Sequence, residues 1–262
     1  MVFQKIADKL SYYYRIAATG FSFFHFSAGG FFLGVAVFPL VIAWPSKKTK
    51  KKARIQKIIH YSFRYFFWQM KIMGILKVKV ENAEKLKSGK SMLVIANHPT
   101  LIDIVFILSH MPRADCVVKL HAWNHPFFGR VARAAGYIKN DDPVEVIDRC
   151  VENLNKGDNV IIFPEGTRTS PDVVIDKFQK GAARIALKSG CNILPIKLDC
   201  QPRTLTKDKK WYEVAKKRFQ LSMNVGELID VAPVVKNAKN QFAAVKKLTN
   251  FFRDYYLKEV AV

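Results

Sequence analysis

Residues 16–44 contain no Lys, Arg, Asp or Glu, and this uncharged stretch restricts the folds open to the chain more than any other feature. Its 29 residues are rich in Phe, Gly and Ala, whereas about 20 apolar residues are enough for a helix to cross a bilayer. A buried helix of a soluble core does not need so long an uncharged run. The stretch therefore predicts membrane contact, either as a span or, because Gly29, Gly30 and Gly34 allow a bend, as a re-entrant or in-plane helical hairpin.

A basic cluster follows the uncharged stretch directly, after Trp44 and Pro45. Its members are Lys47, Lys48, Lys50, Lys51, Lys52 and Arg54. Basic residues beside an apolar segment mark its cytoplasmic side, and each interacts favourably with anionic headgroups by about 1 kcal/mol near the surface. We therefore expect a membrane-associated protein with its folded domain on the cytoplasmic side, which is the inner membrane if the organism is bacterial. The apolar run is too long for a cleaved secretory signal.

The formal net charge of +22 indicates a negatively charged partner, which can be nucleic acid, an anionic membrane or an acidic protein. No helix-turn-helix, zinc-finger or RNA-recognition motif is present, so we expect membrane lipid and no nucleic acid. The four cysteines include no CxxC pair, which is typical of a reducing compartment. His121 and His125 are four residues apart but lack a third ligand, and we expect neither a metal nor an organic cofactor.

The pattern of the chain changes at about residue 77. Residues 55–76 mix aromatic and basic side chains at helical spacing, which fits an amphipathic helix on a membrane and a plain packing helix equally well. Beyond them, strands are expected at 78–80, 91–96, 115–119, 159–163, 193–198 and 218–225, and helices at 101–110, 127–135, 142–154, 177–189 and 242–256. This alternation predicts an α/β domain over 77–262 that follows membrane-associated helices over 1–76.

His98 lies where a buried strand is expected to give way to a helix. The apolar run 91–96 precedes it, and Pro99 suits the first turn of a helix. Asp103 comes five residues after His98, so on that helix its carboxylate can turn back toward the imidazole. A carboxylate that holds a histidine in one tautomer makes it a better general base. The same spacing also arises by chance, and no serine or cysteine nucleophile accompanies the pair.

A second motif follows the expected strand at 159–163. Residues 163–169 are Phe-Pro-Glu-Gly-Thr-Arg-Thr, and Pro164 with Gly166 favours a turn. The backbone amides of such a turn can converge with the guanidinium of Arg168 on one anion, and the planar fork of arginine suits phosphate. Taken alone, the segment fits an ordinary turn with a solvated arginine. Beside His98, it predicts a general base near a bound anion.

Together, the two motifs resemble those of the glycerolipid acyltransferases, the family that acylates lysophosphatidate and glycerol-3-phosphate. His98 and Asp103 match the family's histidine followed by an aspartate after four intervening residues. Residues 163–168 match its Phe-Pro-Glu-Gly-Thr-Arg block, and residues 193–196 match its apolar run around a proline. The resemblance extends over residues 91–198. It implies a mixed sheet flanked by helices and an O-acyltransferase that uses an acyl thioester.

The resemblance also implies roles for individual residues. His98 would act as the general base and Asp103 would orient it, while the substrate-binding residues are Glu165, Gly166, Thr167, Arg168 and Lys139. Lys139 is included because the family's second block, here residues 136–141, usually ends in an arginine that this chain lacks. A lysine supplies charge without the bidentate geometry of arginine. The departure concerns the identity of the acceptor and leaves acyl transfer unaffected.

The predicted function is transfer of a fatty acyl group from acyl carrier protein or coenzyme A to a lysophospholipid hydroxyl, with 1-acyl-sn-glycerol-3-phosphate as the first acceptor expected. The expected partners are this acyl donor, an anionic lysolipid acceptor and membrane lipids. One alternative keeps the chemistry but changes the acceptor to another lysolipid or a specialised lipid. An alternative of another class is a non-catalytic membrane-binding scaffold, and the intact pair of His98 and Asp103 counts against it.

Overall fold

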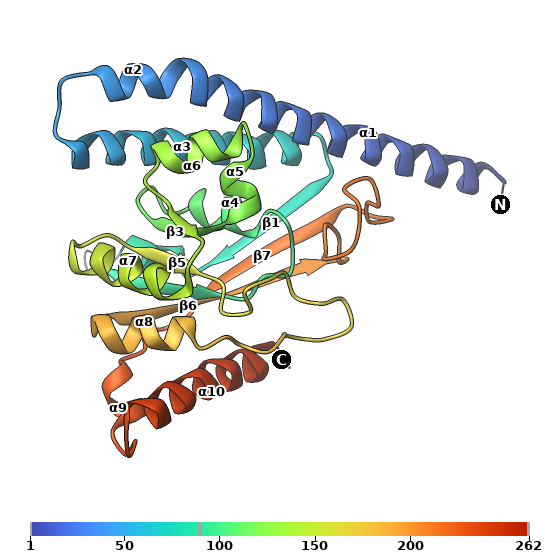
Figure 1. Cartoon of the computed structure of the whole chain (residues 1–262). Coiled ribbons are helices and arrows are strands. Elements are labelled where there is room, and N and C mark those ends of the chain that lie inside the picture. The colour runs from blue at the N-terminus through green and yellow to red at the C-terminus, as the bar shows by residue number, and fades with distance from the viewer. Residues whose placement is uncertain (1, 88–90, 261–262) are drawn as a thin grey trace.

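The computed structural model describes residues 2–87 and 91–260. Its helices are α1 (Val2–Phe32), the π-helical turn η1 (Leu33–Val37), α2 (Phe38–Ala43), α3 (Lys48–Ile72), the 3-10 turn η2 (Ala83–Lys87), α4 (Asp103–Leu108), α5 (Leu120–Asn124), α6 (Phe128–Ala134), α7 (Pro143–Asn155), α8 (Gly181–Ser189), α9 (Val231–Val235) and α10 (Gln241–Val260). Its strands are β1 (Leu76–Glu81), β2 (Met92–Ala96), β3 (Asp115–Lys119), β4 (Ile138–Asn140), β5 (Val160–Ile162), β6 (Asn192–Gln201) and β7 (Phe219–Val225). Figure 1 shows these elements along the chain.

The seven strands form one mixed sheet in the order β1-β7-β6-β2-β5-β3-β4. The strands from β6 to β4 pair in parallel, with β2 at the centre between β6 and β5. β7 runs antiparallel to β6 and pairs in parallel with β1, so these two strands point the opposite way. The expected mixed sheet flanked by helices is confirmed.

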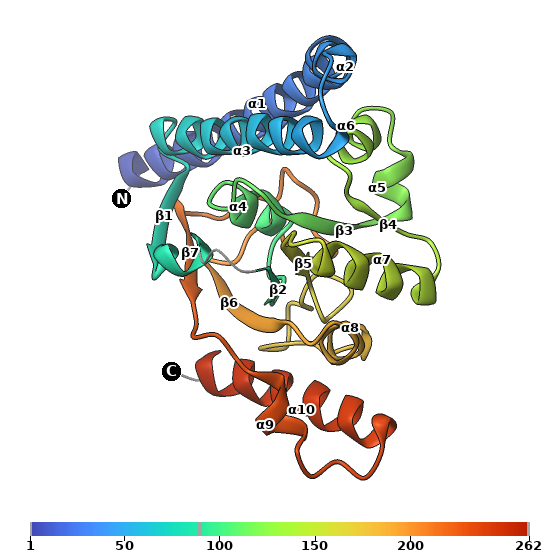
Figure 2. The same ribbon diagram turned by 90° about the vertical axis from the view of Figure 1, so that its left-hand side faces the viewer.

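Helices cover both faces of the sheet. The central strand β2 is therefore buried on both sides, which explains its unbroken apolar sequence. All five of its residues are buried. Met92, Val94 and Ala96 join the core on the side of α3 and α4, whereas Leu93 and Ile95 join the core beneath α8 and α10. A parallel strand buried on both faces needs an unbroken apolar run rather than alternation. Figure 2 shows the sheet between these two helical layers.

The N-terminal helical segment is longer than the uncharged stretch. Helix begins at Val2 and continues through α1, η1 and α2 to Ala43. Of the three glycines that allow a bend, Gly29 and Gly30 lie inside α1, and Gly34 lies in the π-helical turn η1. This turn ends two residues before Pro39, whose ring nitrogen has no N–H to continue the regular hydrogen-bond pattern. The chain reverses only after Ala43, so the hairpin is formed by α1 and α2 with α3.

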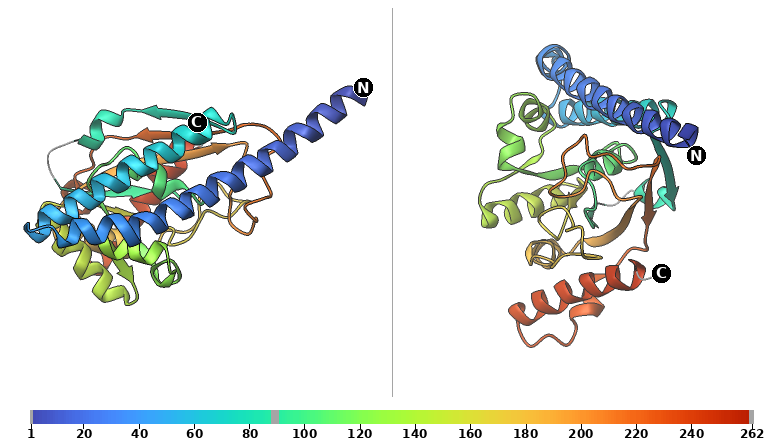
Figure 3. Two further views of the ribbon diagram at one scale, coloured as in Figure 1. Left: turned by 90° about the horizontal axis from the view of Figure 1, so that it is seen from above. Right: turned by 90° about the vertical axis from the view of Figure 1, so that its right-hand side faces the viewer.

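The outer helix lies along α3 as an additional layer on one side of the molecule (Figure 1). Among the described residues, the helical segment Lys5–Ala43 is the one stretch long and apolar enough to cross a membrane. Its large exposed apolar side chains are Ile6, Leu10, Tyr13, Tyr14, Phe21, Phe24, Phe31, Phe32, Val35, Leu40 and Ile42. In Figure 3 the N-terminal part of α1 extends beyond the rest of the fold. One face of the hairpin therefore packs on protein, and the other presents a broad apolar surface.

Helix α3 packs on the fold through one set of side chains and exposes aromatic side chains elsewhere, so its packing role is confirmed and its membrane role stays a prediction. Ile55, Ile59, Phe66 and Met70 are buried and hold the helix against the fold. Three aromatic side chains of the helix are about half exposed: Tyr61, Tyr65 and Trp68. The helix begins at Lys48, so most of the basic cluster 47–54 lies in its first turns rather than in a linker, and it ends at Ile72, before the predicted end at residue 76.

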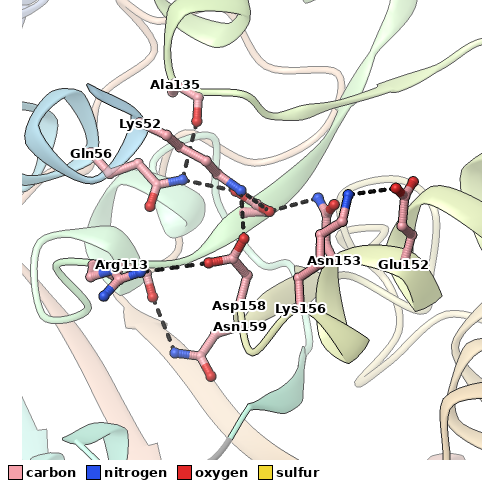
Figure 4. A network of polar contacts seen from close by, with 10 residues as sticks. Lys52, Gln56, Arg113, Ala135, Glu152, Asn153, Lys156, Asp158 and Asn159 are labelled. Atoms are coloured by element: carbon pink, nitrogen blue, oxygen red, sulfur yellow. Dashed lines mark hydrogen bonds and ion pairs between the residues drawn. The ribbon is translucent and has the colours of Figure 1, made fainter. Parts of the chain in front are cut away.

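One lysine of that cluster points into the protein. Lys52 Nζ lies 2.7 Å from Asp115 Oδ2 and 2.8 Å from Asp158 Oδ2. Asp115 is fully buried and also accepts hydrogen bonds from Gln56 Nε2 at 2.8 Å and Asn153 Nδ2 at 2.7 Å. Burial lowers the pKa of Lys52, but the two carboxylates outweigh burial and hold that pKa above its ordinary value. Figure 4 shows this network, which ties α3 to the amino-terminal end of β3.

The predicted start at residue 142 and the predicted end at residue 189 agree with α7 and α8. The side chain of Asp142 caps α7 by accepting from the amides of Val144 and Glu145, and Gly190 ends α8 with a φ of 65°. The predicted helix start at residue 177 is wrong, since α8 begins at Gly181. The helix predicted at 101–110 is also shorter than expected. The division into units at residues 76 and 77 stays a prediction.

Candidate active site

The sheet brings the two sequence motifs to the same edge. β2 and β5 are parallel neighbours, with Ile95 opposite Ile162. Because both strands end at the same edge, the segments that follow them emerge side by side. His98 follows β2 by two residues, and Phe163 follows β5 directly. The backbone N–H of Thr169 donates to the carbonyl of His98 at 2.8 Å, which fastens the two segments together.

The structure places the imidazole of His98 in direct contact with the carboxylate of Asp103. His98 Nδ1 lies 2.8 Å from Asp103 Oδ2. Asp103 is fully buried and also accepts from the backbone N–H of Thr100 at 2.7 Å and from the hydroxyl of Thr100. Three donors thus fix the orientation of this carboxylate before any substrate arrives.

This contact determines which nitrogen of His98 can take a proton. A carboxylate accepts a hydrogen bond, so Nδ1 carries the hydrogen and Nε2 has the free lone pair. The ring of Phe163 stacks on the imidazole, with ring centres 4.1 Å apart and an angle of 18° between the planes. The side chain of His98 remains 18% exposed. An imidazole oriented in this way has the geometry that a general base requires.

The buried side chain of Glu165 connects the two motifs by hydrogen bonds. Its side chain is buried, and Oε1 accepts from the backbone N–H of His98 at 2.8 Å and from the hydroxyl of Thr169 at 2.9 Å. Oε2 accepts from the backbone N–H of Asp176 at 2.9 Å. Burial raises the pKa of Glu165, although these three hydrogen bonds oppose the shift. With both oxygens engaged, Glu165 holds the loops that carry His98.

Replacing Glu165 with alanine should therefore reduce both stability and turnover. The change leaves three buried donors without their acceptor, and one unsatisfied buried group costs about 1–3 kcal/mol. We expect the free energy of unfolding to fall by about 2 kcal/mol, and kcat to fall because His98 loses its backbone support. Thermal unfolding and turnover of Glu165→Ala should be compared with Glu152→Ala, whose side chain lies exposed on α7. Equal stability of the two variants would contradict the conclusion that Glu165 holds these loops together.

The turn after β5 leaves several donors available. The amide of Gly166 closes the turn on the carbonyl of Phe163 at 3.0 Å, and its φ of +68° favours glycine there. In the part of the chain that the structure describes, the amides of Thr167 and Arg168 have no recorded acceptor. The amides of the turn that can donate to an anion are therefore those of Thr167 and Arg168, whereas the amide of Gly166 is already bonded.

The guanidinium of Arg168 is half-buried and held in place by the segment after β6. Nη1 donates to the carbonyl of Leu205 at 3.2 Å and to that of Thr206 at 2.7 Å. Among the described residues, Nε and Nη2 have no recorded partner. These two nitrogens form one side of the planar fork, which is the geometry that binds a phosphate or carboxylate with two parallel hydrogen bonds.

Lys139 lies farther from this centre than the other predicted site residues. It belongs to the edge strand β4, three strands from β2 in the sheet order, which is about 14 Å at the usual spacing. Its Nζ pairs with Asp141 Oδ2 at 2.9 Å. The structure thus brings His98, Asp103 and the loop 165–168 together and leaves Lys139 at the rim of the sheet. Its role in binding substrate stays a prediction.

Two supporting residues escaped the sequence analysis. The side chain of Asn97 pairs with the backbone of Leu198 in β6, through bonds of 2.8 and 2.7 Å, and so extends the sheet next to His98. The hydroxyl of Tyr256 in α10 donates to the carbonyl of Ile95 at 2.7 Å, at the end of β2. Its position directly before His98 was the one sign in the sequence that Asn97 supports the site. Among the described residues, no group of three or more His, Cys, Asp and Glu side chains is placed to hold a metal ion.

Comparisons with known proteins find similarity to acyltransferases. A family model described as Acyltransferase matches residues 77–199. The chain is 32% identical to a chloroplastic 1-acyl-sn-glycerol-3-phosphate acyltransferase of Arabidopsis thaliana over 145 residues, which cover 53% of this chain and 40% of that protein. It is 31% identical to a 1-acyl-sn-glycerol-3-phosphate acyltransferase of Helicobacter pylori over 125 residues, or 45% and 53% of the two chains. The chain spans about half the length of these curated relatives.

A solved structure supports the fold over nearly the whole chain. The crystal structure of the 1-acyl-sn-glycerophosphate acyltransferase of Thermotoga maritima aligns with a TM-score of 0.74, covering 94% of this chain and 96% of that one. The sequences are 21% identical, so the likeness concerns the fold. It includes the N-terminal helices as well as the α/β part.

Proposed function

We propose that the chain is a member of the acyltransferase family, whose model matches residues 77–199, and that it transfers a fatty acyl group from a thioester to a hydroxyl of a lysophospholipid. The acceptor we propose is 1-acyl-sn-glycerol-3-phosphate, the acceptor in the names of the similar proteins of Arabidopsis thaliana and Helicobacter pylori. One observation carries the proposal most directly: a carboxylate-oriented imidazole lies next to a loop with an unoccupied arginine fork. A general base and an anion site are what acylation of a phosphate-bearing alcohol requires.

In the proposed reaction, Nε2 of His98 removes the proton from the acceptor hydroxyl as its oxygen attacks the thioester carbonyl. The C–S bond then breaks, the new ester forms, and the thiolate leaves with the proton from the imidazolium. Asp103 stabilises that imidazolium in between, since it already accepts from Nδ1. Transfer is direct in this scheme, without an acyl-enzyme.

The phosphate of the acceptor is proposed to bind at the turn after β5. Nε and Nη2 of Arg168 and the amides of Thr167 and Arg168 would donate to its oxygens. Fixing the phosphate would hold the hydroxyl next to His98, and such positioning supplies a large part of the acceleration of a two-substrate reaction. Glu165 acts only through the loops in this scheme, while Lys139 would add charge at the rim.

Replacing Arg168 with alanine tests the phosphate site. KM for a phosphorylated acceptor should rise by about 10–100-fold, because a charge-assisted bidentate contact contributes about 1.5–3 kcal/mol. KM for the acyl donor should change little, and an acceptor without phosphate should be acylated about equally by both forms. Arg149→Ala, on the exposed face of α7, is the matched control. An equal rise in both KM values would show that Arg168 does not hold the acceptor.

We propose that the chain acts at a membrane surface with α1 and α2 lying in the plane of the interface. α1 is fastened along its length: Tyr14 donates to the carbonyl of Met73 at 2.8 Å, and His25 Nδ1 lies 2.8 Å from Gln69 Oε1. A helix that crossed the bilayer would have to leave these contacts. An in-plane helix keeps them and buries its other, apolar face in lipid. The basic cluster 47–54 supports the further proposal that the catalytic domain lies on the cytoplasmic side.

The acceptor and the donor are tested together. Purified protein in vesicles should be given acyl carrier protein or coenzyme A thioesters with lysophosphatidate, glycerol-3-phosphate, other lysolipids and non-phosphorylated alcohols. We expect lysophosphatidate to give the highest kcat/KM. A different lysolipid as the best acceptor would keep the chemistry and replace the substrate. Membrane binding without turnover on any acceptor would favour the scaffold.

A further inference from the structure

The connection between β6 and β7, residues 203–218, contains a concentration of charge that the proposed chemistry does not use. It has seven basic residues and two acidic ones, together with two adjacent aromatic residues. The basic residues are Arg203, Lys207, Lys209, Lys210, Lys216, Lys217 and Arg218. This segment is named the β6–β7 loop below.

The base of the β6–β7 loop is fixed to the protein. Arg218 donates to the carbonyl of Leu76 through Nε at 3.0 Å and Nη2 at 2.7 Å. From the membrane hairpin, Arg15 donates to the carbonyls of Ala215 at 3.1 Å and Lys216 at 2.5 Å. The loop is therefore attached both to the strand β1 and to the outer helix α1.

The outer part of the loop is exposed. Lys209, Lys210, Lys216 and Lys217 are all exposed, and among the described residues no carboxylate lies within ion-pair distance of them. Trp211 and Tyr212 are 47% and 42% exposed. Lys210 Nζ lies 5.6 Å from the centre of the Tyr212 ring. Four exposed lysines next to two exposed aromatic rings therefore form one surface that can contact both a negatively charged group and an apolar boundary.

The position of Trp211 identifies that partner. Its ring rests on α1 at Gly20, where an added Cβ would come within 3.0 Å of the indole. The next exposed apolar residues of α1 are Phe21 and Phe24. The aromatic tip of the loop is therefore continuous with the apolar face of the outer helix, and Figures 1 and 3 show loop and helix side by side. Aromatic rings at the interface and lysines at the headgroups are the arrangement that anionic lipid surfaces favour.

We propose that the β6–β7 loop is a second membrane-binding element, which binds the headgroups of anionic lipids beside the active site. The inference rests on the proposed action at a membrane. It adds to that proposal an element outside the apolar hairpin and a preference for negatively charged bilayers.

The loop also connects the lipid surface with the site. It starts at the end of β6, on the same edge of the sheet as His98. The carbonyl of Leu205 accepts from the backbone N–H of Leu101 at 3.0 Å and from Arg168, which Thr206 also holds. The residues that would bind headgroups and those that fix the arginine fork thus belong to one segment. A lysolipid that leaves the bilayer at this loop would meet Arg168 within the same segment.

Vesicle binding of the full chain tests the proposal. The loop variant combines Lys209→Gln, Lys210→Gln, Lys216→Gln and Lys217→Gln. The control variant makes the same charge change on the far side of the molecule, with Lys236→Gln, Lys239→Gln, Lys246→Gln and Lys247→Gln, which are also exposed. Flotation is measured with vesicles of phosphatidylcholine alone and with vesicles that also contain phosphatidylglycerol.

We expect the loop variant to lose at least about tenfold in binding to the anionic vesicles and to keep wild-type binding to the neutral ones. The control variant should bind both as the wild type does. Equal binding by the two variants would overturn the proposal, as would an equal loss on both kinds of vesicle, which would assign the effect to the apolar hairpin. So would a loop variant that binds vesicles normally and fails only with acyl carrier protein as donor.

A second measurement does not depend on charge. Trp211 is made the single tryptophan by replacing Trp44, Trp68 and Trp123 with Phe, and vesicles whose acyl chains carry bromine should quench its fluorescence, because the indole is expected at the interface. Quenching no stronger than with vesicles that lack bromine would contradict an interfacial Trp211. Neither readout requires turnover, so a failure of the loop proposal is distinct from a failure of the proposed acyl transfer.

Discussion

Replacing His98 with alanine should reduce acyl transfer by about 10²–10⁴-fold, the usual contribution of a general base. In the proposed mechanism the imidazole is the general base, and its orientation is set by Asp103, 2.8 Å from Nδ1, and by the ring of Phe163 stacked on it. Removing the imidazole leaves the turn after β5, the proposed phosphate site, and the hairpin of α1, α2 and α3 intact. The loss should therefore appear in kcat, with little change in KM for either substrate.

Two further variants separate chemistry from folding. Asp103→Asn keeps the size of the side chain but removes the charge that stabilises the imidazolium, so kcat should again fall steeply. His121→Ala removes an exposed histidine on α5 and should behave as the wild type. His98→Ala should still bind vesicles. Turnover retained in His98→Ala would rule out its role as the base.

Replacing Asp115 with alanine should cause the largest loss of stability. The buried carboxylate accepts from Lys52, Gln56 and Asn153, and its removal leaves Lys52 with Asp158 alone and takes an acceptor from both amides. Breaking a buried ion pair from one side costs about 3–5 kcal/mol, which corresponds to a fall of roughly 10 °C in melting temperature. Thermal unfolding in detergent measures it.

The exposed pair of Asp148 and Lys188 provides the matched control. Their charged atoms are 2.6 Å apart, but both side chains are more than half exposed, so Asp148→Ala should cost less than about 1 kcal/mol. A similar small loss in Asp115→Ala would mean that the network of Figure 4 does not hold α3 to the sheet.

The features that the sequence predicted best are local. The contact between His98 and Asp103 spans five residues, and a strand-to-helix junction is enough to form it. The central strands were recognised because a strand buried on both faces leaves an unbroken apolar run. The cap of α7 depends on Asp142 and its immediate neighbours.

The features that it did not predict depend on distant partners. Lys52 is 63 residues from Asp115, and nothing in the cluster 47–54 distinguishes the lysine that turns inward from those that face out. The guanidinium of Arg168 is fixed by the backbone carbonyls of residues 205 and 206. Every residue has a backbone carbonyl, so the sequence does not indicate which ones Arg168 contacts. The strand order, with β1 and β7 at one edge, likewise follows from contacts between segments far apart in the chain.

The late start of α8 shows how tertiary contacts override local propensity. Residues 177–189 have a helical pattern, yet the helix begins at Gly181. Glu165 accepts from the amide of Asp176, and the carbonyl of Pro164 accepts from the amide of Gln179 at 2.7 Å. The active-site turn thus binds the backbone that would otherwise form the first turn of the helix.

The identity of the product tests the central claim most directly. The purified full-length protein in anionic vesicles should be given one acyl thioester and one lysophosphatidate with acyl chains of different mass. The account predicts phosphatidate that carries both chains, formed in equal amount with free thiol, as measured by mass spectrometry and a thiol assay. Free fatty acid in place of phosphatidate, or no release of thiol, would contradict it.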